Sequence, residues 1–528
     1  MNTFRFTKQD WLAALFVTLF VLFIGAATLT KGVPDWGDDF AAYMSEGMAI
    51  ADGEFHEQTV RNYTMHPSPL TLEASEDGLV YVWGYPLMLS VIYKLVGFDR
   101  VNYSSILWYK IPLLISVGLL GGVLVLFFRR RFFLGLSAVL ALLVCLSGDL
   151  FGAMNNLYSD LPFLFFSMLT FLIVEEVAEN VQEGKKGIWL GILYGAVLWF
   201  THELRLNGMT VCAVAFFGHA LILLKNRKGI KKKGIWMHVI PYVVFIALTF
   251  ITEHLWLAPA TSNMSDVGRA TSKMLSENIA EYWKMIYGYL DGLFGVKLHF
   301  AGYVLVAAVV LGILFKGITE NLHLTLLVIG TLIVDVMLPY RQGLRYIYNI
   351  LPLLVMFAAY GLQFIVKFII KVMKVPGKYL EYAGVVLSVL VLAMPVYSHM
   401  KDGIFNLNHW GWMNYDDVYI GEAVEVYNYI QENVPEDNII AFAKPRALYL
   451  NTGRVAIRTG YNGHRISDAD YYLQYHISHS EFSPEKEEAA RTPMEEMFSN
   501  EFFTLYKIVT GEEEIVSPDM DGAGYENG

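Results

Sequence analysis

Residues 11–30, WLAALFVTLFVLFIGAATLT, form a long segment without a charged side chain. A helix of about twenty apolar residues is long enough to cross the hydrocarbon core of a bilayer. The segment is longer than the apolar region of a signal peptide, and no small-residue cleavage site precedes the acidic stretch that follows. We therefore expect a retained transmembrane helix, preceded by Arg5 and Lys8.

Apolar runs of similar length recur along the chain. Of its 528 residues, 55% are hydrophobic and only 17% are charged, whereas about a quarter of the residues of soluble domains are charged. The pattern predicts a polytopic α-helical membrane protein with about eleven transmembrane helices. Their expected positions are residues 11–30, 105–128, 132–149, 160–176, 187–202, 207–224, 235–257, 301–316, 321–338, 345–366 and 379–397. A shorter apolar run at 85–96 is expected to lie along the interface as an amphipathic helix.

Basic loops predict the orientation of these helices. Arg129, Arg130 and Arg131, the lysines between 225 and 233, and those at 367, 371 and 374 all fall on the side of the N-terminus. By the positive-inside rule, the N-terminus is cytoplasmic, and the loops 31–84 and 258–300 face outward with everything after residue 398. The net charge of −11, with basic residues confined to short loops, argues against nucleic-acid binding. Cys145 and Cys212 both lie in apolar runs, so no disulfide framework is expected.

The composition changes after residue 398. One apolar face predicts an amphipathic helix that ends before Pro435, with Ile420, Ala423, Val426, Tyr427 and Ile430 on that face. Strands are expected at 439–442, 471–473 and 502–509, and a short helix at 445–450. We expect three parts: a transmembrane domain at 1–398 with an acidic motif in loop 31–84, an extracytoplasmic α/β domain at 399–510, and an acidic, disordered tail at 511–528. The sequence has no G-x-G-x-x-G motif, so no dinucleotide site is indicated.

Ionisable side chains gather at the outward ends of the predicted helices. Such residues are costly in a membrane and tend to mark function. They include Asp160, His202, Glu203, Arg205, Glu253, His254, Asp335, Arg341 and Arg345. The loop after the first helix adds an acidic pair, Asp38 and Asp39. We therefore expect any site to lie at the outer interface.

Acids and arginines at an interface suit the transfer of a sugar from a polyprenyl phosphate to a hydroxyl. A carboxylate would take the hydroxyl proton. Arginine would hold the leaving phosphate with a charge that does not titrate.

Several short motifs resemble those of the GT-C type glycosyltransferases, close to the protein O-mannosyltransferase and aminoarabinose-transferase group. They are Gly-Asp-Asp-Phe-Ala-Ala-Tyr at 37–43, Trp-Gly-Tyr-Pro at 83–86, Tyr-Ser-Asp-Leu-Pro at 158–162, Arg345-Tyr346 followed by Leu351-Pro352, and the segment 444–454, which resembles soluble domains appended to bacterial members. The resemblance implies an inverting enzyme of the hexosyl- or pentosyltransferase kind in the bacterial cell membrane. Its partners would be a polyprenyl-phosphate-linked sugar, a glycan, lipid or protein hydroxyl, and the bilayer.

The resemblance also implies roles for individual residues. An Asp-Glu pair carries the catalytic base in this family, so the base would be Asp38, with Asp39 in the place of the Glu. Arg345, Arg341, Arg205, Tyr346, Asp160 and Tyr85 are the expected substrate-binding residues. No cofactor and no metal are expected, although oligosaccharyltransferases of the wider class need a metal ion.

Simpler interpretations remain open. Asp38, Asp39 and Asp160 could cap helices, and Arg341 and Arg345 could be interface anchors. His202 and Glu203 with His254 could suggest a metal, but two histidines on different helices are weak evidence. The alternative functions are a lipid-carrier flippase or transporter, and a lipid-linked glycan polymerase or ligase. Midplane charges and inverted repeats, which would favour a transporter, are not evident in the sequence.

Overall fold

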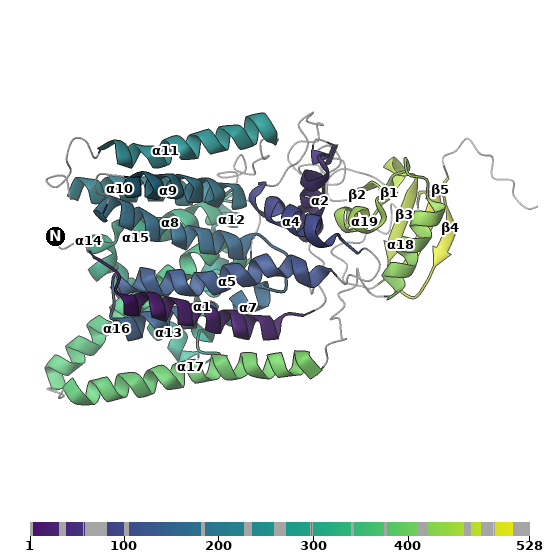
Figure 1. Cartoon of the computed structure of the whole chain (residues 1–528). Helices are drawn as coiled ribbons and strands as arrows, with labels where there is room; N and C mark the ends of the chain where they lie inside the picture. The colour runs from purple at the N-terminus through teal and green to yellow at the C-terminus, as the bar shows by residue number, and fades with distance from the viewer. Residues whose placement is uncertain are drawn as a thin grey trace, which may run out of the picture. The chain divides into compact units, whose positions relative to one another are not determined.

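In a computed structural model, the chain folds into two compact units, one helical and one α/β (Figure 1). The structure describes residues 4–30, 38–55, 57–58, 82–99, 105–180, 185–225, 235–257, 271–295, 297, 299–338, 343–373, 377–408, 421–458, 466–476, 489 and 491–509. The helical unit ends at Asp416, and the C-terminal unit begins at Asp417. Arg341 and the tail from 511 to 528 lie outside the described residues.

The helical unit is a bundle of long helices (Figure 1). In chain order the main elements are α1 (Lys8–Thr28), α2 (Asp38–Asp52), α4 (Gly84–Val96), α5 (Ile106–Arg129), α6 (Leu134–Cys145), α7 (Gly148–Ala153), α8 (Asp160–Asn180), α9 (Lys185–Leu204), α10 (Gly208–Lys225), α11 (Ile235–Phe250), the π-helix η3 (Ile251–Trp256), α12 (Ser272–Gly292), α13 (Phe300–Gly312), the π-helix η5 (Ile313–Gly317), α14 (Ile318–Glu320), α15 (Leu322–Val336), the 3₁₀ helix η6 (Leu344–Ile350), α16 (Leu351–Met373) and α17 (Gly377–Asn408).

A helix occurs at each of the eleven positions predicted from the apolar runs. In the described part of the chain, seven helical segments are long and apolar enough to cross a membrane. They are Lys8–Thr28, Ile106–Arg129, Asp160–Ala178, Gly208–Lys225, His238–Trp256, Phe300–Glu320 and Leu344–Val372. α6 and α15 are apolar but shorter. The architecture of a multi-pass helical protein is therefore established, and the count of eleven crossings stays a prediction.

The apolar faces of these helices pack closely. A side chain at Gly361 of α16 would place its Cβ 2.0 Å from the carbonyl oxygen of Ala308 in α13. A Cβ at Gly312 would likewise lie 1.9 Å from the carbonyl oxygen of Phe357. The two backbones therefore lie in direct contact, which only glycine permits at these positions.

The end of the bundle that carries the basic loops is held by buried ion pairs. Asp10 caps the start of α1 together with Thr7 and accepts a 2.6 Å bond from Nε of Arg129. Arg130 and Arg131 both pair with Glu175 of α8. The positive charges that predict a cytoplasmic end are thus also structural contacts.

Helices α2 and α4 lie together at the opposite end of the bundle from the N-terminus (Figure 1). α4 was expected from the sequence, at residues 85–96. α12 was not expected, because its segment mixes polar, aromatic and aliphatic residues without an apolar run. Its buried positions include Asn278, Tyr282 and Tyr289, a helical spacing that would have identified one face.

The C-terminal unit is a small α/β domain. Its elements are α18 (Gly421–Asn433), β1 (Ile440–Ala441), α19 (Pro445–Thr452), β2 (Ala456–Ile457), the 3₁₀ turn η7 (Ile466–Asp468), β3 (Tyr471–Tyr475), β4 (Met494–Ser499) and β5 (Phe503–Ile508). The sheet has the order β2-β1-β3-β5-β4, with β1 parallel to β2 and β3, and β5 antiparallel to β3 and β4. Gly453 ends α19 in the left-handed conformation, with φ of 73°, as a C-terminal glycine permits.

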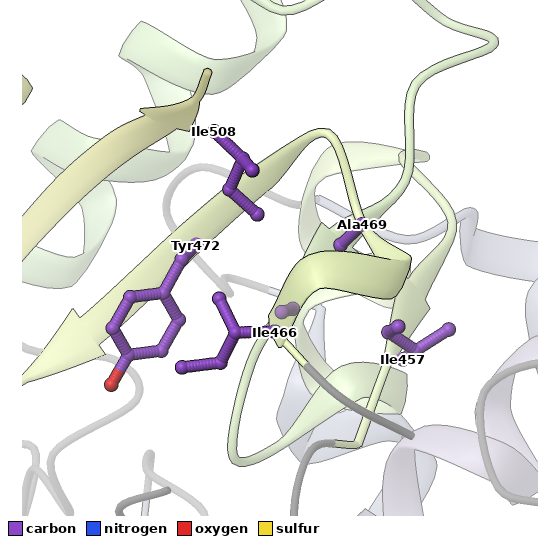
Figure 2. Packing of buried hydrophobic residues seen from close by; sticks show 6 residues of the cluster. Ile457, Ile466, Ala469, Tyr472 and Ile508 are labelled. Atoms are coloured by element: carbon purple, nitrogen blue, oxygen red, sulfur yellow. The ribbon is translucent and has the colours of Figure 1, made fainter. Parts of the chain in front are cut away.

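The core of this unit confirms the expected strands and helix faces. Ala423, Val426, Tyr427 and Ile430 of α18 are buried. Ala441, Ile457, Ile466, Ala469, Tyr472 and Ile508 form one apolar cluster (Figure 2). The sequence missed β2, which is two residues long, and β4, whose side chains are mostly exposed. α17 continues to Asn408, across the expected boundary after residue 398, because a helix needs no apolar residues to continue once it leaves the apolar run.

Candidate functional site

Asp39 and Arg345 form an ion pair between two elements far apart in the chain. Nη2 of Arg345 donates to Oδ2 of Asp39 at 2.8 Å. Asp39 lies in the first turn of α2, and Arg345 lies in η6, which leads into α16. Both side chains are about one-third exposed. The pair is therefore fixed in position but still open to solvent or a ligand.

Asp160 and Arg205 form a second and more deeply buried ion pair. Asp160 begins α8, and Arg205 lies in the short connection between α9 and α10. Nη1 of Arg205 donates to Oδ1 of Asp160. Burial by itself lowers the pKa of Arg205, but the Asp160 carboxylate outweighs it, and the net result is a raised pKa. The guanidinium therefore stays charged although it is buried.

The ring of Tyr346 lies beside both arginines. The guanidinium carbon of Arg205 is 4.5 Å from the ring centroid, and that of Arg345 is 5.4 Å from it. Arg345 also lies over Tyr158, at 4.6 Å. These distances are typical of cation–π contacts. The two ion pairs and the two rings thus form one continuous group, which we call the arginine cluster: Asp39, Tyr158, Asp160, Arg205, Arg345 and Tyr346.

Tyr43 and Tyr85 continue this cluster into α2 and α4. Oη of Tyr43 lies 3.3 Å from Oγ of Ser159, next to Asp160. The rings of Tyr43 and Tyr85 meet edge to face at 5.2 Å. Burial, together with the Asp39 carboxylate, raises the pKa of Tyr43, so its hydroxyl remains a neutral hydrogen-bond donor.

The close approach of α4 to α9 depends on one glycine. A Cβ at Gly84 would lie 2.6 Å from the carbonyl oxygen of Glu203. Since Gly84 precedes Tyr85, this contact fixes Tyr85 against the end of α9, where Arg205 follows. The close contact between α4 and α9 therefore explains why the second residue of the Trp-Gly-Tyr-Pro motif is glycine.

Three buried polar atoms near the cluster have no hydrogen-bond partner among the described residues. They are Oη of Tyr85, Oη of Tyr282 and Oδ2 of Asp335. The other carboxylate oxygen of Asp335 accepts from Asn207 at 3.3 Å. Burial, and then the charges of Asp335 and Tyr346, raise the pKa of Tyr282, which places α12 beside the cluster. Buried polar atoms without partners are rare, and a bound molecule with hydroxyl groups would supply them.

The structure thus brings together six residues that the sequence nominated: Asp39, Asp160, Arg205, Arg345, Tyr346 and Tyr85. Asp38 begins α2 beside them, but its side chain lies outside the described part of the chain, as does Arg341. Sequence reasoning missed Asn207 and Tyr282. Asn207 follows Arg205 by two residues without any motif, and Tyr282 lies on the unexpected helix α12.

A separate polar group lies at the end of α9. His202, Glu203 and Glu253 each place a potential ligand atom within 4.8 Å of the others. The sequence suggested His254 as the third member, but the π-helical turn of η3 brings Glu253 instead.

Comparison with known proteins relates the fold to solved structures. No protein-family model and no curated protein sequence matches the chain. ArnT from Cupriavidus metallidurans, solved bound to undecaprenyl phosphate, is similar with a TM-score of 0.54 and 12% identity over 95% of this chain and 98% of that one. The archaeal oligosaccharyltransferase AglB from Archaeoglobus fulgidus, solved with an inhibitory peptide and a dolichol-phosphate, is similar with a TM-score of 0.53. The sequence identity is 10%, over 88% of this chain and 69% of that one. Both are GT-C glycosyltransferases.

The chain has the GT-C fold. A second structure of the A. fulgidus enzyme, tethered to an acceptor peptide containing the NVT sequon, has a TM-score of 0.52 and 10% identity over 89% of this chain and 69% of that one. The GT-C resemblance seen in the sequence motifs is therefore confirmed at the level of the fold. At such low identity the likeness concerns the arrangement of the backbone, and the chemistry has to be argued from this chain's own residues.

Proposed function

We propose that this protein is an inverting glycosyltransferase that moves a sugar from a polyprenyl-phosphate donor to a hydroxyl acceptor. The arginine cluster is the observation that carries the proposal. It combines two permanent positive charges, two carboxylates and aromatic rings at one end of an apolar bundle. ArnT with undecaprenyl phosphate and AglB with a dolichol-phosphate show that this fold accommodates polyprenyl phosphates.

The reaction places two demands on the site. The acceptor oxygen attacks the anomeric carbon from the face opposite the phosphate, and the bond from that carbon to the phosphate oxygen breaks. The electron pair of this bond stays with the polyprenyl phosphate, which therefore gains one negative charge. The hydroxyl proton of the acceptor moves to a carboxylate. The site must supply both a base and fixed positive charge.

In our proposal Arg345 and Arg205 hold the phosphate. A guanidinium has five N–H donors, so its bond to a carboxylate leaves others to bind phosphate oxygens. Asp39 and Asp160 orient the two arginines, and Tyr346 packs between them. Arg341 would add a further charge from the segment just before η6. Fixed charges of this kind stabilise the leaving group without rearrangement during the reaction.

Asp38 is the general base in this proposal, and Asp39 positions it and Arg345. Asp39 already shares its charge with Arg345, which makes it the less suitable proton acceptor. Asp38 precedes it at the start of α2. No step of this reaction uses a cofactor or a metal.

Unpaired hydroxyl and carboxylate atoms of Tyr85, Tyr282 and Asp335 would bind the hydroxyl groups of the sugar. We place the reaction at the outer face of a bacterial cell membrane, with the N-terminus inside and the C-terminal domain outside, because of the basic loops. The acceptor would be a protein, lipid or glycan hydroxyl.

The experiment is a transfer assay with the purified full-length chain. A panel of synthetic polyprenyl-phosphate hexoses and pentoses is offered in detergent, and release of polyprenyl phosphate is measured. Release with one donor, lost in an Arg345→Ala variant, supports the proposal. A flippase or transporter would release no polyprenyl phosphate from any donor. A polymerase or ligase would instead need a polyprenyl-linked glycan chain as its substrate.

A further inference from the structure

The end of α9 carries a group of ligand-type side chains that the proposed transfer reaction does not use. Nε2 of His202 lies 3.4 Å from Oε1 of Glu253. Glu203 contributes a carboxylate oxygen within 4.8 Å of the other two ligand atoms. The His202 and Glu253 side chains are 12% and 23% exposed, and Glu203 is 2% exposed. The group is therefore largely shielded from solvent.

The backbone around this group is held in place from both sides. Nε1 of Trp199, one turn before Glu203, donates to Oγ1 of Thr252 at 2.8 Å. Thr252 precedes Glu253 in η3, the π-helical segment that ends α11. A π-helical turn contains more residues than an α-helical turn, and such turns often occur at functional sites. Here it directs Glu253 toward His202, whereas the next residue, His254, packs on the ring of Phe250.

An ion pair alone does not satisfy the group. His202 and Glu253 can pair with each other, but this leaves the buried carboxylate of Glu203 beside a second carboxylate. Oε1 of Glu203 and Nδ1 of His202 are both buried and have no hydrogen-bond partner among the described residues. With both carboxyl groups ionised, the two acids and one imidazole carry net negative charge in a shielded place, and a bound cation would offset it.

We propose that His202, Glu203 and Glu253 bind one divalent transition-metal cation, Zn²⁺ or Mn²⁺. An imidazole nitrogen with carboxylate oxygens is a usual ligand set for such ions. With bonds of about 2.0–2.2 Å, ligand atoms around a tetrahedral ion are about 3.5 Å apart. The 3.4 Å separation of His202 and Glu253 meets this requirement. Glu203 would be the third protein ligand, from within 4.8 Å of the other two ligand atoms, and water would complete the coordination.

The ion would join the end of α9 to η3 and thereby hold the backbone that leads into Arg205. Arg205 follows Glu203 by two residues, and Gly84 packs on the Glu203 carbonyl from α4. The three metal-binding residues are thus positioning residues for the arginine cluster, without contact to the reacting atoms. The role is distinct from the metal that some oligosaccharyltransferases need for the reaction itself.

The test is metal binding by the full-length chain, measured without any donor or acceptor. The purified protein is stripped with a chelator, dialysed against Zn²⁺ or Mn²⁺ alone, and the bound metal is counted by mass spectrometry. We expect one ion per chain, and a rise in unfolding temperature when the ion is restored. Glu203→Gln and Glu253→Gln should each weaken binding by more than about 10-fold, whereas His254→Gln should bind as the wild type does.

The His254→Gln variant is a matched control, because His254 adjoins Glu253 on the same π-helix but points away from the group. Each variant is first shown to be monodisperse, so that lost binding is not mistaken for unfolding. Absence of saturable binding to the wild type would overturn the proposal. So would binding that Glu203→Gln and Glu253→Gln leave unchanged. Neither result bears on whether the chain transfers sugars.

Discussion

Arg345 donates to Asp39 at 2.8 Å across 306 positions of the sequence. This bond joins α2 to the segment that precedes α16. Because Arg345 also lies over Tyr158 and Tyr346, it contacts three of the five other members of the arginine cluster. An interface anchor would instead extend toward lipid headgroups. The contacts of Arg345 with Asp39, Tyr158 and Tyr346 therefore favour a role inside the site.

We expect Arg345→Ala to reduce sugar transfer by about 30-fold, because one charge-assisted contact to the leaving phosphate contributes about 2 kcal/mol. The measurement is the steady-state rate of polyprenyl phosphate release. Lys94→Ala is the control, since Lys94 also pairs with an acid of α2, Asp52, at 3.1 Å, but both side chains are exposed. That pair contributes little, and its loss should leave the rate unchanged. Equal rates of polyprenyl phosphate release in Arg345→Ala and Lys94→Ala would contradict phosphate binding by Arg345 and leave it as an interface anchor.

Asp160 and Arg205 should show a different pattern, because their pair is buried. Removing one partner leaves an uncompensated charge, which costs about 3–5 kcal/mol. Arg205→Ala and Asp160→Ala should both lower the unfolding temperature measured in detergent. Arg205→Lys keeps the charge but loses the planar contacts to Asp160 and Tyr346. We expect it to fold and to transfer slowly, and wild-type turnover in Arg205→Lys would show that the reaction does not need a bidentate guanidinium at this position.

Tyr85→Phe should separate substrate binding from stability. Oη of Tyr85 has no partner among the described residues, so its removal should not destabilise the free protein. We expect a raised KM for the donor and an unchanged unfolding temperature. Tyr109→Phe is the matched control, because Oη of Tyr109 donates to the carbonyl of Gly97 at 2.8 Å. It should lose about 1 kcal/mol of stability and keep its activity. An unchanged KM in Tyr85→Phe would remove Tyr85 from the sugar site.

Topology is tested by cysteine labelling at Lys228 and at Asn406. The basic loop around Lys228 should react only after the membrane is permeabilised, whereas Asn406 should react in intact cells. The native cysteines are both buried and are replaced first. Labelling of both positions from the same side would move the arginine cluster to the other face or change the number of crossings.

The sequence predicted the positions of the apolar helices well, because an apolar run is a local feature. Twenty uncharged residues predict α1 without reference to the rest of the chain, and Pro445 with Gly453 predicts the short helix between them. The pairing of Asp39 with Arg345, and of Asp160 with Arg205, could only be guessed from their shared location at helix ends. Such pairing depends on how the helices pack against one another, and this packing cannot be derived from a single sequence.

Two features were missed from the sequence for identifiable reasons. α12, which carries Tyr282, has no apolar run, so only the helical spacing of Asn278, Tyr282 and Tyr289 marks its buried face. Glu253 rather than His254 meets His202 because η3 is a π-helix, and a π-helical turn changes which residue faces a neighbour. Local deviations of this kind alter a site without any signal in the residue types.

The central claim is tested most directly by the rate of polyprenyl phosphate release in three chains: the wild type, Asp38→Asn and Asp39→Asn. A general base contributes about 10²–10⁴-fold, whereas Asn caps a helix as well as Asp. We predict that Asp38→Asn folds and binds the donor but loses at least about 100-fold in rate, and that Asp39→Asn is affected less. Near-normal release by both variants, in a preparation whose wild type is active, would contradict the account and leave the acidic pair as a helix cap.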